Sequence, residues 1–422
     1  MSALGTRRNF FERINLAVTG FLFARALPFQ KAVAPEPVPD AVDYYDKLGI
    51  TKRINAAGTY TYLTGSLMPP SVQAAVAHAA KHPVFLEELQ KAAGEYLAQK
   101  LRCEAAMVTA GAASGVTLAT AACMTAANGP STGHAMPTDM NGLKNEVIVQ
   151  KGHHYDYDHA MRNCGIRFVD VETLQEYESA FTRNTVMCFF YNASDAGKIS
   201  REDWIRVAQA HGVPCLNDAA ADVPPISNLW NYTQMGFDLV AFSGGKGIRG
   251  PQNAGLLLGR KNLITAATQN NSPNDDVVGR GMKVAKEQIV GMVAAVDWFL
   301  SQSDASFEAE FRQRAERIAA ALKDIPTLTA EIFTPPIANN VPHLLIRYDL
   351  RRVQITAKEV AKKLRAGTPS IELNPATGST EASAGIPKDA NKIVVGVWML
   401  EPGQDVIVAR RLREVLTQAT TS

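Results

Sequence analysis

The chain contains 422 residues, of which 46% are hydrophobic and 20% are charged, and its formal net charge is +2. This composition is typical of a globular protein, and the length favours more than one domain. Because the sequence has no long basic or acidic run, it does not indicate nucleic acid as a partner. The five cysteines form no C-x-x-C pair, which disfavours a zinc ribbon, a dithiol redox motif and a disulfide framework.

The N-terminus has the pattern of an export signal. Arg7 and Arg8 precede an apolar run at residues 14–24, which is too short to cross a bilayer as a helix. The segment RRNFF resembles a twin-arginine signal, the type that exports folded proteins. The A-x-A sequences at residues 24–26 and 32–34 offer cleavage sites. We expect residues 1–34 to be a signal and the mature protein to be periplasmic, without stable membrane association. The alternative is a cytoplasmic protein with an amphipathic N-terminal helix.

Beyond a proline-rich tether at residues 35–40, short apolar strands alternate with helices. Residues 104–124 predict a strand, a turn at Gly111 and an alanine-rich helix. The further strands that we expect are residues 145–150, 186–191, 213–218, 238–243 and 254–259. Strands separated by helices predict an α/β fold with a mostly parallel sheet that is covered on both faces.

From about residue 286 the pattern changes to two long amphipathic helices, followed by strands and helices in mixed order. The expected helices are residues 286–301, 306–325, 356–367 and 405–418, and the expected strands are residues 343–349 and 392–400. We therefore expect a large domain over residues 35–304 and a smaller α+β domain over residues 305–422.

Three segments follow predicted strands, at the sheet edge where parallel α/β proteins bind ligands. The first is a turn of small residues, whose backbone N–H groups at a helix start suit a phosphate. It consists of Gly111, Ala112, Ala113, Ser114 and Gly115. Taken alone it is a weak signal, because such turns are common. The second segment ends its strand at Asp218, which either meets a ligand or caps a helix.

The third segment places Lys246 among glycines directly after a strand. It does not match a phosphate-binding P-loop, because Gly247 stands where Ser or Thr is needed. A lysine in such a turn suits a Schiff base to an aldehyde cofactor. Pyridoxal 5'-phosphate needs such a lysine, an acidic partner for its ring nitrogen and a phosphate site. All three occur here, so the sequence predicts this cofactor.

The chain resembles pyridoxal-phosphate enzymes of fold type I, in the branch of selenocysteine synthase (seryl-tRNA selenium transferase) and D-glucosaminate-6-phosphate ammonia-lyase, and is closer to the lyase side. The resemblance covers about residues 50 to 300 and rests on INAAGTYTYLTGSLMPP, NDAAADVPP, LVAFSGGKGIRGPQNAGLLLGRK and GRGMKVAKEQIVG, among other segments. It implies an aspartate-aminotransferase-like large domain. It also implies at least a homodimer, in which the turn Gly250–Gln252 reaches the partner.

The stretch GHHYDYDH at residues 152–159 raises the question of a metal site. The resemblance places it on a loop over one face of the cofactor ring, with His153 as the first and His154 as the second choice for stacking there. The alternatives are a metal site, which lacks a distant Cys/His pair, and a purely structural role. We expect no metal.

Together with the resemblance to the lyase branch, the lysine, the aspartate and the phosphate site imply an α,β-elimination. Lys246 would hold the cofactor and, once freed, remove the Cα proton, while Asp218 keeps the ring nitrogen protonated. Ser243 would help to hold the phosphate. Loss of a Cβ hydroxyl as water then leads to a 2-keto acid and ammonia. The expected substrate is an amino sugar acid or a β-hydroxy amino acid.

The sequence offers several residues that could contact the substrate and does not rank them. The candidates are Tyr60, Tyr62, Arg249, Gln252, Arg280 and Arg365. Ordinary packing is an equal alternative for the tyrosines. Two other functions remain open, namely a pyridoxal-phosphate-dependent transferase (an aminotransferase or selenium transferase) and a non-catalytic cofactor-binding protein.

Overall fold

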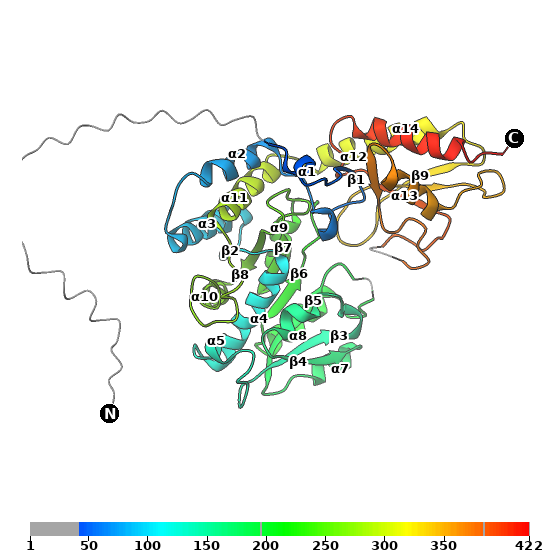
Figure 1. Cartoon of the computed structure of the whole chain (residues 1–422). Coiled ribbons are helices and arrows are strands. Elements are labelled where there is room, and N and C mark those ends of the chain that lie inside the picture. Colours follow the sequence, from blue (N-terminus) through cyan, green and yellow to red (C-terminus); the bar gives the residue numbers. More distant parts are fainter. Residues whose placement is uncertain (1–41, 195, 383–384, 422) are drawn as a thin grey trace, which may run out of the picture. The chain divides into compact units, whose positions relative to one another are not determined.

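The computed structural model describes residues 42–194, 196–382 and 385–421 (Figure 1). Residues 52–422 form one compact unit, to which all the elements below belong. The part of the chain before it contributes one described helix, α1 (Tyr44–Lys47). The export signal expected at residues 1–34 lies outside the described residues. In the part that the structure describes, no helix is long and apolar enough to cross a membrane.

A seven-stranded sheet forms the centre of the large domain, in the order β2-β8-β7-β6-β5-β3-β4. Its strands are β2 (Ala105–Thr109), β3 (Glu146–Gln150), β4 (Arg167–Val171), β5 (Thr185–Tyr191), β6 (Cys215–Asp218), β7 (Leu239–Ser243) and β8 (Gly255–Gly259). Strands β3 to β7 pair in parallel, and β8 is antiparallel to both of its neighbours. The predicted α/β fold with a mostly parallel sheet is thereby confirmed.

Side chains alternate between the two faces of this sheet, so that it separates two apolar clusters. Met107 on β2 belongs to one cluster, while its neighbours Ala106 and Val108 belong to the other. The helices on the side of Met107 are α4 (Ala112–Asn128), α6 (Asp158–Arg162) and α10 (Lys261–Gln269). Those on the other side are α3 (Leu86–Leu101), α7 (Leu174–Ser179), α8 (Arg201–Ala210), α9 (Asn228–Met235) and α11 (Lys286–Leu300). Helix α2 (Pro70–Ala79) runs beside α11 (Figure 1).

The C-terminal part builds a second, smaller sheet, as predicted. An antiparallel sheet contains β9 (Thr329–Phe333), β10 (His343–Arg347) and β12 (Ile393–Gly396). Helices α12 (Asp304–Leu322) and α14 (Gln404–Thr417) pack on each other, and α13 (Ala357–Ala366) packs on the next strand, β11 (Ser370–Leu373). The domain boundary near residue 305 stays a prediction.

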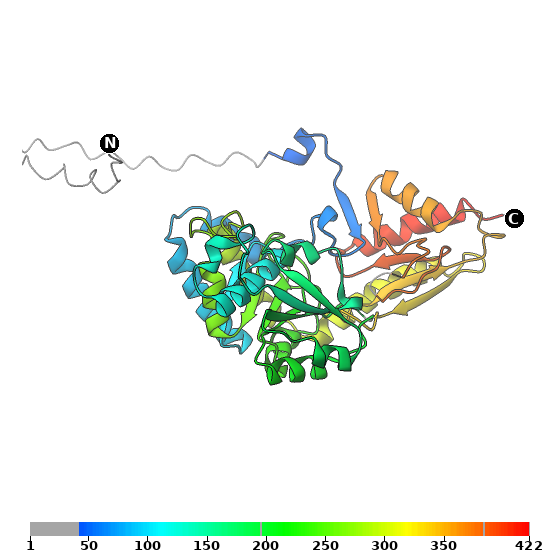
Figure 2. The ribbon, with the colours of Figure 1, turned by 90° about the horizontal axis from the view of Figure 1, so that it is seen from below.

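An N-terminal strand joins this C-terminal part. Strand β1 (Arg53–Ala56) pairs in parallel with β11, so that Arg53 lies opposite Ser370 and Ala56 opposite Leu373. Figure 2 shows this early strand beside the C-terminal elements. The pairing was not expected from the sequence, because parallel partners so far apart leave no local pattern.

Candidate active site

The site lies at the carboxyl ends of β6 and β7. Asp218 is the last residue of β6 and is in register with Ala241 on β7. Lys246 follows β7 by three residues, in a turn of residues 244–248. Because β6 and β7 are parallel neighbours, Asp218 and Lys246 lie at the same edge of the sheet.

The glycines around Lys246 let the turn pack against backbone on two sides. A Cβ atom at Gly247 would lie 2.2 Å from the carbonyl oxygen of Val223, and one at Gly245 would lie 2.6 Å from Cα of Gln252. The backbone N–H of Ser66 donates to the carbonyl of Gly245 at 2.9 Å. The lysine turn is therefore held between the segment after β6 and the N-terminal segment after β1.

Asp218 is a buried carboxylate with few partners. Its Oδ2 accepts a hydrogen bond from the Tyr155 hydroxyl, and its Oδ1 accepts one from the backbone N–H of Ala220 at 3.0 Å. Burial raises the pKa of Asp218, whereas these hydrogen bonds and the charge of Lys246 lower it. A cationic ring nitrogen nearby would favour the ionised form of this group.

Two carboxylates, those of Asp218 and Asp222, act on the charge of Lys246. Burial lowers the pKa of the Lys246 amine, and the charges of Asp218 and Asp222 act in the opposite direction. Asp222 is fully buried, and burial raises its pKa to about 7 although Asn192 donates to it. The sequence prediction did not include Asp222. The sequence feature that could have indicated it is the second aspartate of NDAAAD, at the end of the small-residue turn that follows Asp218.

The sequence predicts an anion site at the start of α4. Gly111 precedes the helix with φ of 88° and no side-chain cap, so the N–H groups of the first turn face outward without a side-chain acceptor. The Ser114 hydroxyl donates instead to the carbonyl of Ala110 at 2.9 Å. Ser243 is in register with Gly255, and a Cβ atom at Gly255 would lie 2.6 Å from the carbonyl carbon of Gly111. Ser243 thus lies beside the start of α4.

His153, the first choice for stacking, is a buried residue. Its ring packs edge-on against Phe190, with ring centroids 4.4 Å apart, and its Nδ1 accepts a hydrogen bond from the backbone N–H of Tyr191. Phe190 belongs to the apolar cluster on the face opposite to that of Phe189. Burial lowers the pKa of His153 to about 4, as expected for a neutral core histidine.

Tyr155, rather than either histidine, contacts Asp218. Its ring lies 4.2 Å from that of Tyr191 and stacks on Phe189 at 5.8 Å, on the face where it also reaches Asp218. The second choice, His154, is bound on both ring nitrogens, to Asp158 at 2.5 Å and to Asp170 at 2.9 Å. Although partial burial lowers the pKa of His154, these two carboxylates raise it above its usual value.

The predicted substrate residues are bound within the chain. Arg249, with φ of 58°, donates to the carbonyl of Leu67 and to Glu401, both at 2.8 Å. The other residues have these partners: Gln252 donates to the carbonyl of Thr61, Arg280 pairs with Asp275, Arg365 pairs with Glu372, and Asn374 donates to the Tyr60 hydroxyl. Pro251 packs on Gly291 of α11. The turn Gly250–Gln252 therefore contacts its own chain.

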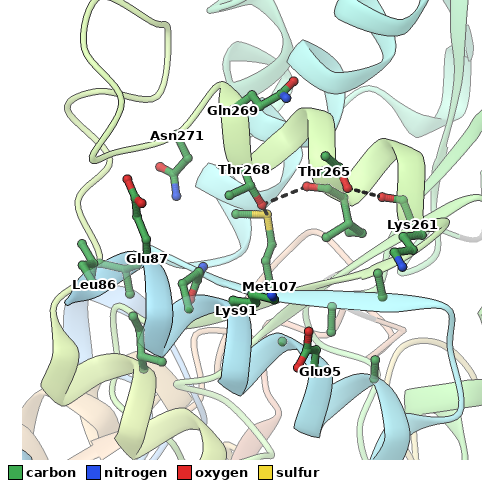
Figure 3. Close-up of a pocket in the computed structure, with 18 of the residues that line it drawn as sticks. Leu86, Glu87, Lys91, Glu95, Met107, Lys261, Thr265, Thr268, Gln269 and Asn271 are labelled. Atoms are coloured by element: carbon green, nitrogen blue, oxygen red, sulfur yellow. Dashed lines mark hydrogen bonds between the residues drawn. The ribbon is translucent and has the colours of Figure 1, made fainter. Parts of the chain in front are cut away.

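A cavity of about 760 Å³ lies elsewhere, between α3, the edge strand β2 and α10 (Figure 3). Leu86, Met107 and Thr268 are among the residues that line it, and no predicted site residue does. Among the residues that the structure describes, no group of three or more His, Cys, Asp or Glu side chains could hold a metal ion.

The residues at the sheet edge fit pyridoxal phosphate. Lys246 offers an amine, Asp218 a buried carboxylate whose pKa only this lysine lowers as a cation among the described residues, and α4 an uncapped helix start beside Ser243. The fold and this site define a pyridoxal-phosphate-dependent enzyme of fold type I. The family model for SelA, L-seryl-tRNA selenium transferase, matches residues 53–334, and the chain belongs to this family. The predicted resemblance and cofactor are thereby confirmed.

The chain is similar to several known proteins. The D-glucosaminate-6-phosphate ammonia lyase of Salmonella typhimurium (strain 14028s / SGSC 2262) is 29% identical over 392 residues, covering 89% of this chain and 98% of the relative. A 5'-C-glycyluridine monooxygenase-decarboxylase of a Streptomyces species is 30% identical over 387 residues, covering 88% of this chain and 92% of the relative. An L-seryl-tRNA(Sec) selenium transferase of Aquifex aeolicus (strain VF5) is 25% identical over 263 residues, covering 53% of this chain and 56% of the relative.

Solved structures agree with the fold. A structure of D-glucosaminate-6-phosphate ammonia-lyase matches with a TM-score of 0.76 and 27% identity, covering 90% of this chain and 100% of that chain. A NifS-like protein matches with a TM-score of 0.56 and 15% identity, covering 87% of this chain and 100% of that chain, which shows the fold alone.

Proposed function

We propose that the protein is a lyase that catalyses α,β-elimination on an amino sugar acid or a β-hydroxy amino acid and releases a 2-keto acid and ammonia. The observation that carries this proposal is the site itself. It holds the Lys246 amine within electrostatic range of two carboxylates, on a chain that aligns with an ammonia lyase over 89% of its length. The bound cofactor supplies the electron sink for a carbanion at Cα.

Each residue of the site has a defined task in this proposal. Lys246 binds the cofactor and later takes up the Cα proton, which its neutral amine can do because burial lowers its pKa. Asp218 holds the proton on the ring nitrogen. The first N–H groups of α4 and Ser243 bind the phosphate. The hydroxyl on Cβ leaves as water, and hydrolysis of the product gives the 2-keto acid and ammonia.

The substrate carboxylate needs a cationic partner, and we rank Arg249 first among the candidate arginines. Arg249 directly follows the turn of Lys246, and its backbone N–H donates to the Lys246 carbonyl at 3.0 Å. Arg365 instead pairs with Glu372 on β11, and Arg280 pairs with Asp275. Arg249 already pairs with Glu401 at 2.8 Å. The carboxylate of a substrate would therefore compete with Glu401 for the guanidinium.

The proposal is tested by incubating the purified holoenzyme with a panel of amino sugar acids, with and without a phosphate group, and of β-hydroxy amino acids. We expect a 2-keto acid and ammonia in equal amounts from at least one unphosphorylated substrate, and none from the Lys246→Ala variant. Turnover of phosphorylated sugar acids alone would correct the substrate class. Release of neither product from any compound would overturn the lyase assignment.

A second candidate reaction follows from the Streptomyces relative, which is named as a monooxygenase-decarboxylase and is 30% identical. The same panel separates the two reactions if oxygen uptake and carbon dioxide release are recorded together. An elimination consumes no oxygen and releases no carbon dioxide. Substrate-dependent oxygen uptake with carbon dioxide in equal amount would replace the lyase proposal by this oxidative one.

A further inference from the structure

Asp222 is a buried carboxylate whose hydrogen bonds leave one oxygen without a partner. It is 0% exposed, and its Oδ2 accepts a hydrogen bond from Nδ2 of Asn192. Among the described residues no group donates to its Oδ1. A buried carboxylate oxygen without a donor is unfavourable, so a nearby charge or ligand has to compensate for it.

The segment that carries Asp222 supports the turn of Lys246. The carbonyl of Val223 lies against Gly247, where it leaves no space for a Cβ atom. The backbone N–H of Ser243 donates to the carbonyl of Ala220 at 3.3 Å. This packing brings the Asp222 carboxylate within electrostatic range of the Lys246 amine, and the charge of Asp222 raises the pKa of that amine.

Asn192 links the two aspartates of the site. Its backbone N–H donates to the carbonyl of Asp218 at 3.1 Å, while its side chain donates to the Asp222 carboxylate and lies 2.8 Å from the Tyr232 hydroxyl. The titratable groups that face Asp222 come from four elements and one turn. They are Asp218 on β6, Tyr191 on β5, Arg201 on α8, Tyr232 on α9 and Lys246.

We propose that Asp222 is a positioning residue, a second carboxylate that is oriented by Asn192 and sets the charge of the Lys246 amine. The site has two positive charges to stabilise, one on the ring nitrogen and one on the lysine. In this proposal each is stabilised by its own carboxylate. Asp218 serves the ring, and Asp222 stabilises the ammonium that forms when Lys246 takes up a proton. This proposal rests on the role of Lys246 given above, but its test does not require turnover.

The test measures the Lys246 amine directly in the cofactor-free protein. Brief labelling with acetic anhydride across a range of pH, followed by mass spectrometry of the peptide containing Lys246, gives the pH at which the amine becomes reactive. We expect Asp222→Asn to lower this midpoint by about one pH unit, because a nearby negative charge is lost. Asp222→Glu, which retains the charge, should return the midpoint most of the way to its wild-type value.

A matched control is Asp405→Asn, which removes a carboxylate that is equally buried but pairs with Arg317 at 2.6 Å. It should leave the midpoint of Lys246 unchanged. In the holoenzyme, the pH at which the absorbance of the bound cofactor changes should move in the same direction in Asp222→Asn as in the labelling experiment.

The variant Asn192→Ala decides the question if Asp222→Asn does not fold. Loss of the Asn192 donor raises the pKa of Asp222, so this carboxylate is ionised less often. The Lys246 midpoint should therefore fall, but by less than in Asp222→Asn. An unchanged midpoint in every folded variant of Asp222 and Asn192, or an equal shift in Asp405→Asn, overturns the proposal. Borohydride reduction of the holoenzyme that fixes the cofactor to a different lysine would refute the role of Lys246. The labelling midpoints would then still decide whether Asp222 acts on the Lys246 amine.

Discussion

Asp218 has surroundings that only partly compensate for its charge. A tyrosine hydroxyl and one backbone N–H donate to it, Lys246 attracts it, and burial nevertheless raises its pKa. A protonated ring nitrogen would supply the missing positive charge. The ionised form of Asp218 and the protonated form of the cofactor ring therefore stabilise each other.

The variant Asp218→Asn keeps the shape of the side chain and removes its charge. We expect turnover to fall at least 100-fold, which corresponds to about 3 kcal/mol in the barrier, because the ring nitrogen loses its proton. The measurement is kcat of the holoprotein, with the bound cofactor quantified in parallel. Retention of at least a third of wild-type kcat would contradict the assigned role.

His153 is expected to act on stability rather than on catalysis. Burial depresses its pKa to about 4, so its contribution to stability is present above the unfolded value of 6.5 and is lost as the pH falls toward 4. His153→Asn can still accept from the N–H of Tyr191 but does not titrate. Between pH 7 and pH 5, we expect this variant to lose about 2 kcal/mol less unfolding free energy than the wild type.

Urea unfolding at the two pH values measures this difference. His78→Asn, on the exposed side of α2, serves as the control and should follow the wild type. The same loss in the wild type and in His153→Asn would show that His153 is not the group that titrates.

At this scale the sequence predicted the lysine and the aspartate but not their neighbours. Lys246 and Asp218 stand out because glycines and an apolar strand mark their positions. No local pattern indicates which side chain of the loop after β3 contacts Asp218, so the hydrogen bond from Tyr155 was not predicted. The partners of Arg249 are Leu67 and Glu401, which are 182 and 152 residues away, and no local pattern indicates them.

At the scale of elements, the contact between α4 and β8 positions the helix start that we propose as the phosphate site. Gly255 starts β8, and a Cβ atom there would lie 2.6 Å from the carbonyl carbon of Gly111 and 2.8 Å from the backbone nitrogen of Ala112. Backbone atoms cannot move aside as a flexible side chain does. A methyl group at this position would therefore displace the first turn of α4.

We expect Gly255→Ala to weaken cofactor binding at least tenfold, which equals about 1.4 kcal/mol. The dissociation constant of pyridoxal phosphate from the refilled apoprotein is the measurement. Gly281→Ala, where a Cβ atom would meet nothing within 4 Å, is the matched control. Unchanged affinity in Gly255→Ala would argue against the start of α4 as the phosphate site.

The strands of the sheet were predicted to different degrees for a physical reason. Strands β3, β5, β7 and β8 are almost wholly buried, and each contains a run of three or more apolar residues that is easy to recognise. Strand β4 lies at the sheet edge, where the polar residues Arg167 and Asp170 interrupt its apolar residues, and the sequence did not reveal it. The pairing of β1 with β11 needed tertiary information.

At the scale of the whole molecule, we propose export through the twin-arginine signal. Folding in the cytoplasm would let the protein take up its phosphorylated cofactor before it crosses the membrane. Replacing Arg7 and Arg8 by lysine keeps both charges but should prevent export of a reporter that is fused behind residues 1–40. Normal export of the double variant, or an uncleaved native protein in the cytoplasm, would refute the proposal.

We also propose that the working unit is at least a homodimer. Phe85, which is 77% exposed, directly precedes Leu86 at the cavity of about 760 Å³ beside α3, and Val84 is exposed as well. Exposed apolar groups that adjoin a cavity are typical of an interface. Sedimentation should give a dimer or larger at assay concentration, and Phe85→Glu should shift it toward the monomer. A fully active monomer would contradict this expectation.

The pairing of β1 with β11 ties the order of synthesis to the assembly of the site. The two strands are 317 residues apart at Arg53 and Ser370, so β1 has no partner until almost the whole chain has left the ribosome. The segment after β1 contains Ser66, whose N–H donates to the carbonyl of Gly245 beside Lys246. In a nascent or truncated chain that lacks β11, β1 has no strand partner, so the N-terminal support of the lysine turn is held from one side only, by the packing of α2 on α11.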